Sequence, residues 1–180
     1  MRVLAISGSL RSKSHNTALL RVAADAAPAG VELVLYERLA ELPPYDEDTD
    51  GTVAPISVAR LRRAISSADA LLIATPEYNG SVPGQLKNAI DWASRPYGEQ
   101  SSLWAKPAAV VSASTGGFGG VWAQQELRRI LGIAGARVLS EPQLAVPHAD
   151  RAGEFAHLGS GMRRILEVLV DEAAADRHVA

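Results

Sequence analysis

The chain has 180 residues, of which 47% are hydrophobic and 21% charged, and its formal net charge at pH 7 is -2. This composition is typical of one ordinary folded domain, which we expect to span residues 1–180. The chain has no cysteine, which excludes disulfides, thiolate metal sites, a thiol nucleophile and a dithiol redox centre. Because it has no basic run, few aromatic residues and no apolar run of about 18 residues, we expect a cytoplasmic protein that binds neither nucleic acid nor membrane.

Five short apolar runs predict strands at residues 3–6, 31–36, 70–74, 108–112 and 137–144. Segments with apolar residues at helical spacing follow them, at residues 20–27, 61–68, 86–93, 127–134 and 162–173. The strands are apolar almost throughout, which is typical of parallel strands covered on both faces. This alternation predicts a three-layer α/β/α domain with a five-stranded parallel sheet in the order 2-1-3-4-5, and a ligand beyond the carboxyl ends of its strands.

The loop at residues 43–51 is the most acidic segment of the chain. Its carboxylates lack the spacing of a metal-binding loop, so we interpret it as a solvated turn rather than a metal site. The four histidines also lack close ligand spacing, and we predict no metal.

The loop after the first strand carries hydroxyls, an amide and cations just before a predicted helix, at Ser9, Arg11, Ser14, Asn16 and Thr17. The N-terminus of a helix attracts anions, so this loop is predicted to cradle a phosphate. It contains neither Gly-Lys-Ser/Thr nor Gly-x-Gly-x-x-Gly, which favours a monophosphate over a triphosphate or a dinucleotide. The alternative is a polar turn in which Ser14 or Asn16 caps the helix.

The loop after the third strand contains Pro76, Glu77, Tyr78 and Asn79. Its prolines and glycines fix an irregular backbone, Tyr78 offers a flat face, and Asn79 offers both a donor and an acceptor. These features suit a planar heterocycle, whereas the alternative is a tight connection with Tyr78 on the surface. No second carboxylate stands beside Glu77, so we do not assign it a proton-transfer role.

The loop after the fourth strand contains Ser114, Thr115, Gly116 and Gly117, within a run that has four glycines in five residues. Such a run allows close approach of the backbone to a ligand, although it also suits a flexible surface loop. In a 2-1-3-4-5 sheet the three loops lie side by side. A phosphate at one end and a flat ring at the other predict flavin mononucleotide (FMN).

Three segments together resemble the NADPH-dependent FMN reductase family, whose flavodoxin-like members include quinone, azo and chromate reductases. They are Gly8-Ser9-Leu10-Arg11 with Ser14 and Asn16, then Ala74-Thr75-Pro76-Glu77-Tyr78-Asn79, then Pro83-Gly84-Gln85-Leu86-Lys87-Asn88-Ala89-Ile90-Asp91-Trp92. The resemblance implies a bound FMN whose phosphate is held by Ser9, Arg11, Ser14, Asn16 and Thr17. The isoalloxazine would lie between residues 76–79 and residues 114–117.

The resemblance also implies a ping-pong oxidoreductase that passes a hydride from NADPH or NADH through FMN to quinones or similar small-molecule electron acceptors. No catalytic side chain is required, because the flavin carries the chemistry. A homodimer or homotetramer is implied as well. The alternative is an FMN electron carrier similar to flavodoxin that serves protein partners. The weak net charge and Arg11 argue against it.

Overall fold

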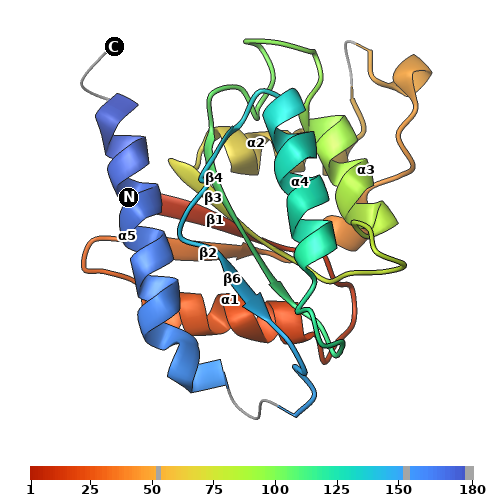
Figure 1. Ribbon diagram of the computed structural model, residues 1–180. Coiled ribbons are helices and arrows are strands. Elements are labelled where there is room, and N and C mark those ends of the chain that lie inside the picture. The colour runs from red at the N-terminus through yellow and green to blue at the C-terminus, as the bar shows by residue number, and fades with distance from the viewer. Residues whose placement is uncertain (52–53, 152–154, 177–180) are drawn as a thin grey trace.

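The computed structural model describes residues 1–51, 54–151 and 155–176, and it places one sheet between two layers of helices (Figure 1). The strands are β1 (Arg2–Ser7), β2 (Glu32–Tyr36), β3 (Ala70–Thr75), β4 (Pro107–Ala113), β5 (Arg137–Val138) and β6 (Leu144–Val146). The helices are α1 (His15–Asp25), α2 (Ile56–Ser66), α3 (Gly84–Ala93), α4 (Val121–Ile133) and α5 (Gly159–Asp176). In the described part of the chain, no helix is both long and apolar enough to cross a membrane.

All strand pairs in the sheet are parallel, and the strand order is β2-β1-β3-β4-β5. The predicted fold class and strand order are therefore confirmed. With this order, the carboxyl ends of β1, β3 and β4 lie next to one another at one edge of the sheet. The loops that follow these three strands meet there, as the sequence predicts.

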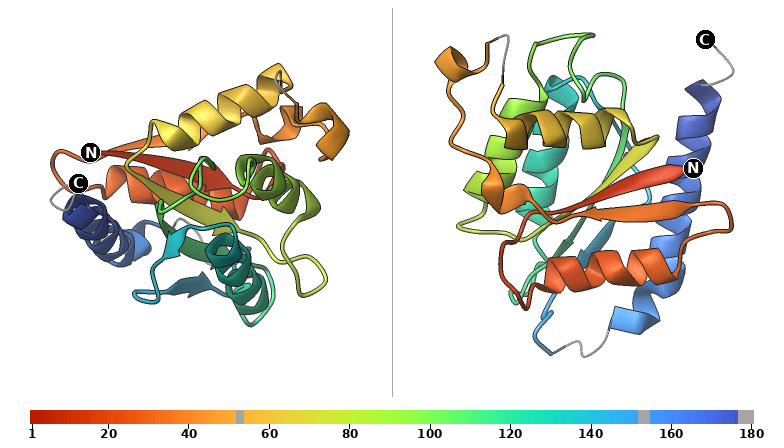
Figure 2. Two further views of the ribbon diagram at one scale, coloured as in Figure 1. Left: turned by 90° about the horizontal axis from the view of Figure 1, so that it is seen from above. Right: turned by 180° about the vertical axis from the view of Figure 1, so that it is seen from behind.

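The two faces of the sheet carry separate hydrophobic cores. Successive strand side chains point to opposite faces, so Val3 and Ala5 pack in the core that includes α1 and α5. Leu4 and Ile6 pack in the core that includes α2, α3 and α4. The two views of Figure 2 show this arrangement, with α1 and α5 on one side of the sheet and the other three helices on the opposite side.

The fifth predicted strand, residues 137–144, is wrong as one continuous strand. β5 pairs with the start of β4 and β6 pairs with its end, and the register shifts by three residues between the two ladders. The Arg128 guanidinium, from α4, donates hydrogen bonds to the carbonyls of Leu139 and Val110. A strand that continued from β5 along β4 would need these two carbonyls for its own hydrogen bonds. Pro142 also has no N–H to donate to such a ladder. The segment between β5 and β6 therefore leaves the sheet.

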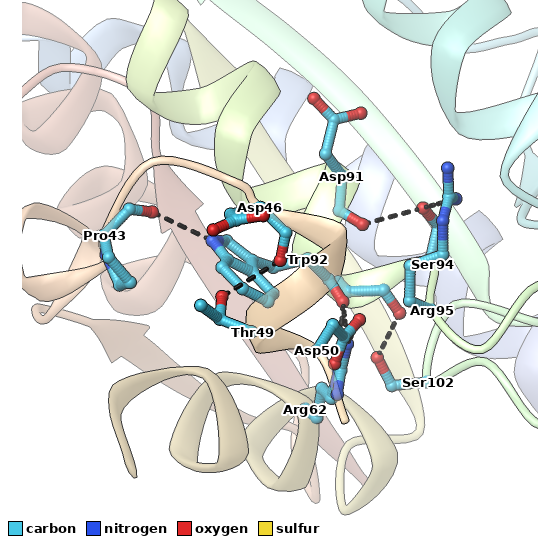
Figure 3. A network of polar contacts seen from close by, with 11 residues as sticks. Pro43, Asp46, Thr49, Asp50, Arg62, Asp91, Trp92, Ser94, Arg95 and Ser102 are labelled. Atoms are coloured by element: carbon cyan, nitrogen blue, oxygen red, sulfur yellow. Dashed lines mark hydrogen bonds and ion pairs between the residues drawn. The ribbon is translucent and has the colours of Figure 1, made fainter. Parts of the chain in front are cut away.

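The acidic loop at residues 43–51 is attached to the end of α3 (Figure 3). The Trp92 indole nitrogen donates to the Pro43 carbonyl at 2.9 Å. Arg62 of α2 pairs with Asp50 at 2.6 Å and also donates to the Trp92 carbonyl at 2.8 Å. The carboxylates at 46–48 are exposed, as expected of a solvated turn, but the two ends of the loop are fixed by these contacts. Among the described residues, no group of three His, Asp or Glu side chains could hold a metal ion.

Candidate functional site

The loops after β1, β3 and β4 border one pocket. Nine of the predicted site residues line it: Ser9, Arg11, Ser14, Asn16, Pro76, Glu77, Tyr78, Ser114 and Thr115. His15 and Ala113 also line it. Ala113 could not be singled out from the sequence, because it offers only its main chain and a small apolar side chain. Thr17, Asn79, Gly116 and Gly117 are not among the lining residues.

The first turn of α1 leaves several hydrogen-bond donors available at the pocket. Ser14 is the N-cap, and its hydroxyl oxygen accepts from the Thr17 N–H at 3.1 Å. No described residue accepts from the hydroxyls of Ser9 and Ser14 or from the N–H groups of His15 and Asn16. Both serines are nearly buried, with 9% and 5% of their surface exposed. Buried donors are normally paired, so this group of four is suited to an external acceptor such as a phosphate.

Arg11 lies on the same loop and is exposed. It makes no ion pair with any residue in the described part of the chain. Its positive charge is therefore available to an anion held by the first turn of α1. This arrangement matches the requirements of a charged phosphate better than those of a neutral ligand.

The side chains of Asn16 and Thr17 are both engaged within the protein. The Asn16 amide nitrogen donates to the Ala113 carbonyl at 2.9 Å, and its oxygen accepts from the Ala113 N–H at 2.9 Å. The Thr17 hydroxyl donates to Ser7 at 2.8 Å. Asn16 thus fastens the start of α1 to the end of β4. Its main-chain N–H remains free for a ligand at the pocket.

The loop after β3 forms a short hairpin at the edge of the pocket. Tyr78 and Ser81 exchange two main-chain hydrogen bonds of 3.1 Å. The two residues between them have positive φ angles, 53° at Asn79 and 73° at Gly80, as a tight hairpin turn requires. Asn79 and Gly80 thus form the turn, and Asn79, which the sequence predicts to face a ligand, lies outside the lining. Tyr78 is 49% exposed and offers an open aromatic surface beside the pocket.

Two carboxylates connect the loop after β3 to α4. Glu77 Oε2 accepts from the N–H groups of Trp122 and Ala123, both at 3.1 Å. Glu126 Oε2 accepts from the Ser81 hydroxyl at 2.6 Å and from the Val82 N–H at 3.1 Å. These two hydrogen bonds, the one from Ser81 above all, hold the pKa of Glu126 below its usual value. Neither contact could be predicted from the sequence, because each joins positions about 45 residues apart.

The loop after β4 turns sharply at Gly119, where φ is 66°. A Cβ atom there would lie 2.9 Å from the main-chain nitrogen of Val146, so both the angle and the space require glycine. The Ser112 hydroxyl donates to the Gly119 carbonyl and accepts from the buried Gln124 amide at 2.7 Å. Gly116 and Gly117 are exposed outside the lining. The end of the loop is therefore fixed, while its exposed part borders the pocket through Ser114 and Thr115.

The chain is similar to known proteins in both sequence and fold. The sequence model of the NADPH-dependent FMN reductase family matches residues 1–151. An NAD(P)H-dependent FMN reductase of Pseudomonas aeruginosa is 45% identical over 152 residues, covering 84% of this chain and 80% of that protein. A quinone reductase of Pseudomonas putida is 39% identical over 179 residues, covering 96% and 92%.

Among solved structures, the flavoenzyme NAD(P)H:(acceptor) oxidoreductase FerB of Paracoccus denitrificans has the same fold. Its TM-score is 0.85 at 37% identity, and the match covers 97% of each chain. The predicted family, the enzyme class and the cofactors FMN and NAD(P)H are thereby confirmed. The chain belongs to the NADPH-dependent FMN reductase family.

Proposed function

We propose that this enzyme passes a hydride from NADPH or NADH through FMN to quinones or similar electrophilic small molecules. The observation that carries the proposal is the pocket between the loops after β1, β3 and β4, whose lining includes four donors that pair with no described residue. The acceptor class rests on relatives named quinone reductases that match almost the whole chain at 38% and 39% identity.

The donor set fits the phosphate of FMN. The hydroxyls of Ser9 and Ser14 and the main-chain N–H groups of His15 and Asn16 would each donate to a phosphate oxygen, and Arg11 would supply the opposing charge. Charge-assisted hydrogen bonds contribute about 1.5–3 kcal/mol each, so a few of them suffice to anchor a phosphate. Asn16 contributes through its main chain, while its side chain holds α1 in place. We propose an indirect role for Thr17 as well, through its bond to Ser7.

The ring of FMN would lie between residues 76–79 and residues 114–117. Pro76 is buried and rigid, and Tyr78 offers an exposed aromatic face on one side. The main chain of the glycine-containing segment would lie on the other. These residues would contact the ring and orient it.

Bound FMN supplies the chemistry, because it accepts a hydride from the nicotinamide and returns electrons to the acceptor. The protein contributes binding and orientation, and we assign no side chain a proton-transfer role. We propose that the nicotinamide and the acceptor react with the flavin in turn, which is the ping-pong mechanism that the family resemblance implies.

We also propose that the protein acts in the cytoplasm as a homodimer or homotetramer. Phe118 and Trp122 lie beside the loop after β4 with ring centroids 4.9 Å apart, and they are 66% and 49% exposed. Exposed aromatic pairs of this kind are typical of protein interfaces. An interface over these residues would cover the rim of the flavin pocket.

The test is anaerobic. The protein is reconstituted with FMN, NADPH or NADH is added, and the visible absorbance of the flavin is followed before and after addition of a quinone. We expect bleaching by the nicotinamide and recovery with the quinone. Bound flavin that neither nucleotide bleaches would instead indicate an electron carrier.

The phosphate assignment is tested by Arg11→Ala, with Lys13→Ala, an exposed cation on the same loop, as the matched control. Loss of one charge-assisted bond of about 1.5–3 kcal/mol raises the FMN dissociation constant about 10-fold to 100-fold. Lys13→Ala should leave it within a factor of about two. Equal effects of the two variants would refute a specific contact between Arg11 and the phosphate.

A further inference from the structure

Helix α4 begins beside the flavin pocket without a capping side chain of its own. Its N-cap residue is Gly120, which has a φ of 85°. The cap comes instead from Glu77, whose Oε2 accepts from the N–H groups of Trp122 and Ala123. These second and third N–H groups of the helix are the ones that an N-cap side chain ordinarily binds. The helix is therefore capped by the loop after β3.

Glu77 is also one of the residues that line the pocket, so the side chain that caps α4 belongs to the pocket wall. The N-terminus of a helix carries about half a positive elementary charge. Without Glu77, that positive end would lose the carboxylate that compensates it. The carboxylate therefore supplies negative charge at the position where the helix would otherwise favour an anion.

Glu126 makes a comparable contact one turn further along α4, through the Ser81 hydroxyl and the Val82 N–H. It joins the same two elements as Glu77. Glu126 is not among the residues that line the pocket. Glu126 is therefore a matched control for Glu77, because it connects the same two elements but does not line the pocket.

We infer that Glu77 is a positioning residue for the flavin: it fixes the start of α4 against the loop after β3, and its charge disfavours reduction of the bound FMN. The inference rests on the proposed function, because it assumes FMN in this pocket. The charge effect has a simple cause. Reduction increases the negative charge on the ring, and a nearby carboxylate opposes that increase.

The positioning role is tested on the protein without FMN by amide hydrogen exchange at Trp122 and Ala123. Glu77→Ala removes the acceptor, and exchange at both amides should become at least tenfold faster than in the wild type. Glu77→Gln keeps an acceptor oxygen, and exchange should stay within about threefold. Glu126→Gln should leave both amides unchanged. Wild-type exchange at these amides in Glu77→Ala would overturn the positioning role.

The charge role is tested by the midpoint potential of bound FMN. Glu77→Gln should strengthen binding of reduced FMN relative to oxidised FMN about tenfold, which for a two-electron couple is about 30 mV toward positive potential. Glu126→Gln should leave the potential unchanged. A wild-type potential in Glu77→Gln, or an equal shift in both variants, would overturn the charge role.

These experiments remain informative even if one variant does not fold or if the protein does not bind FMN. Glu77→Gln retains the capping acceptor, so it tests the inference even where Glu77→Ala does not fold. If wild-type protein does not bind FMN, the proposed function fails and the charge role fails with it. The exchange experiment on the apoprotein still decides whether Glu77 caps α4.

Discussion

Replacing Asn16 by alanine removes the link between the first turn of α1 and the central sheet. The Asn16 side chain is 2% exposed, and it forms two hydrogen bonds of 2.9 Å with the main chain of Ala113. Alanine at this position leaves the N–H and the carbonyl of Ala113 without these partners at the buried end of β4. The start of α1 also loses its direct connection to that strand.

The expected loss of stability follows from the two main-chain groups of Ala113 that lose their partners. A buried donor or acceptor left unpaired costs about 1–3 kcal/mol, so loss of both partners should lower the free energy of unfolding by about 2–6 kcal/mol. This is a large part of the roughly 5–15 kcal/mol that stabilises a typical domain. For a protein of this size, the melting temperature falls by about 2–4 °C per kcal/mol.

The assay is equilibrium urea unfolding of the apoprotein, so that FMN binding does not contribute to the measured stability. The urea concentration at the midpoint of unfolding should fall for Asn16→Ala. The slope of the free energy of unfolding against urea concentration should stay unchanged. Ser12→Ala, at an exposed position of the same loop, serves as the control and should change stability by less than about 0.5 kcal/mol. A loss for Asn16→Ala as small as that of the control would refute the reasoning, because it would mean that the Ala113 groups find other partners.

Three further substitutions test other parts of the structure. Gly119→Ala should lower the free energy of unfolding by about 1–3 kcal/mol, because a side chain there meets main-chain atoms at a positive φ. Gly116→Ala, where a Cβ would make only an ordinary contact of 3.6 Å with the Ser114 hydroxyl, should not, and equal urea midpoints would contradict this. Trp92→Phe should cost about 0.5–1.5 kcal/mol in the same assay through loss of its bond to the Pro43 carbonyl, which keeps its bond from Asn88, and unchanged stability would show that the Trp92 bond does not stabilise the fold. The hydrogen bonds of Glu126 lower its pKa, so its stabilising contribution is present above the ordinary value of 4.5 and is lost as the pH falls through the lower folded value. Glu126→Gln should therefore show a shallower loss of melting temperature on acidification, and parallel curves would argue against this linkage.

The sequence is sufficient to predict the fold class because the signals that define it are local. The apolar strands and the helices at 3.6-residue spacing follow from neighbouring residues, and the β–α alternation dictates parallel strands. That order alone places the loops after β1, β3 and β4 at one edge. Nine predicted residues consequently meet in one pocket without any knowledge of their contacts.

The roles of individual side chains depend on long-range contacts that carry no local signal. Asn16 suits a phosphate by residue type, yet its amide binds a main chain 97 residues away. Glu77 stands in the loop predicted to face the ring, but its partners are the first amides of α4. The break between β5 and β6 depends in the same way on Arg128, which reaches the sheet from α4.

The sequence by itself therefore determined the layers, the strand order and the edge of the sheet at which the pocket lies, because hydrophobic periodicity acts over a few residues. The tertiary structure alone decided which polar groups remain free for a ligand. A side chain can satisfy a buried main-chain group anywhere in the fold, and burial makes that pairing obligatory. Only once those pairings are known do Ser9 and Ser14 remain as donors, while Asn16 and Glu77 become parts of the framework that holds the site.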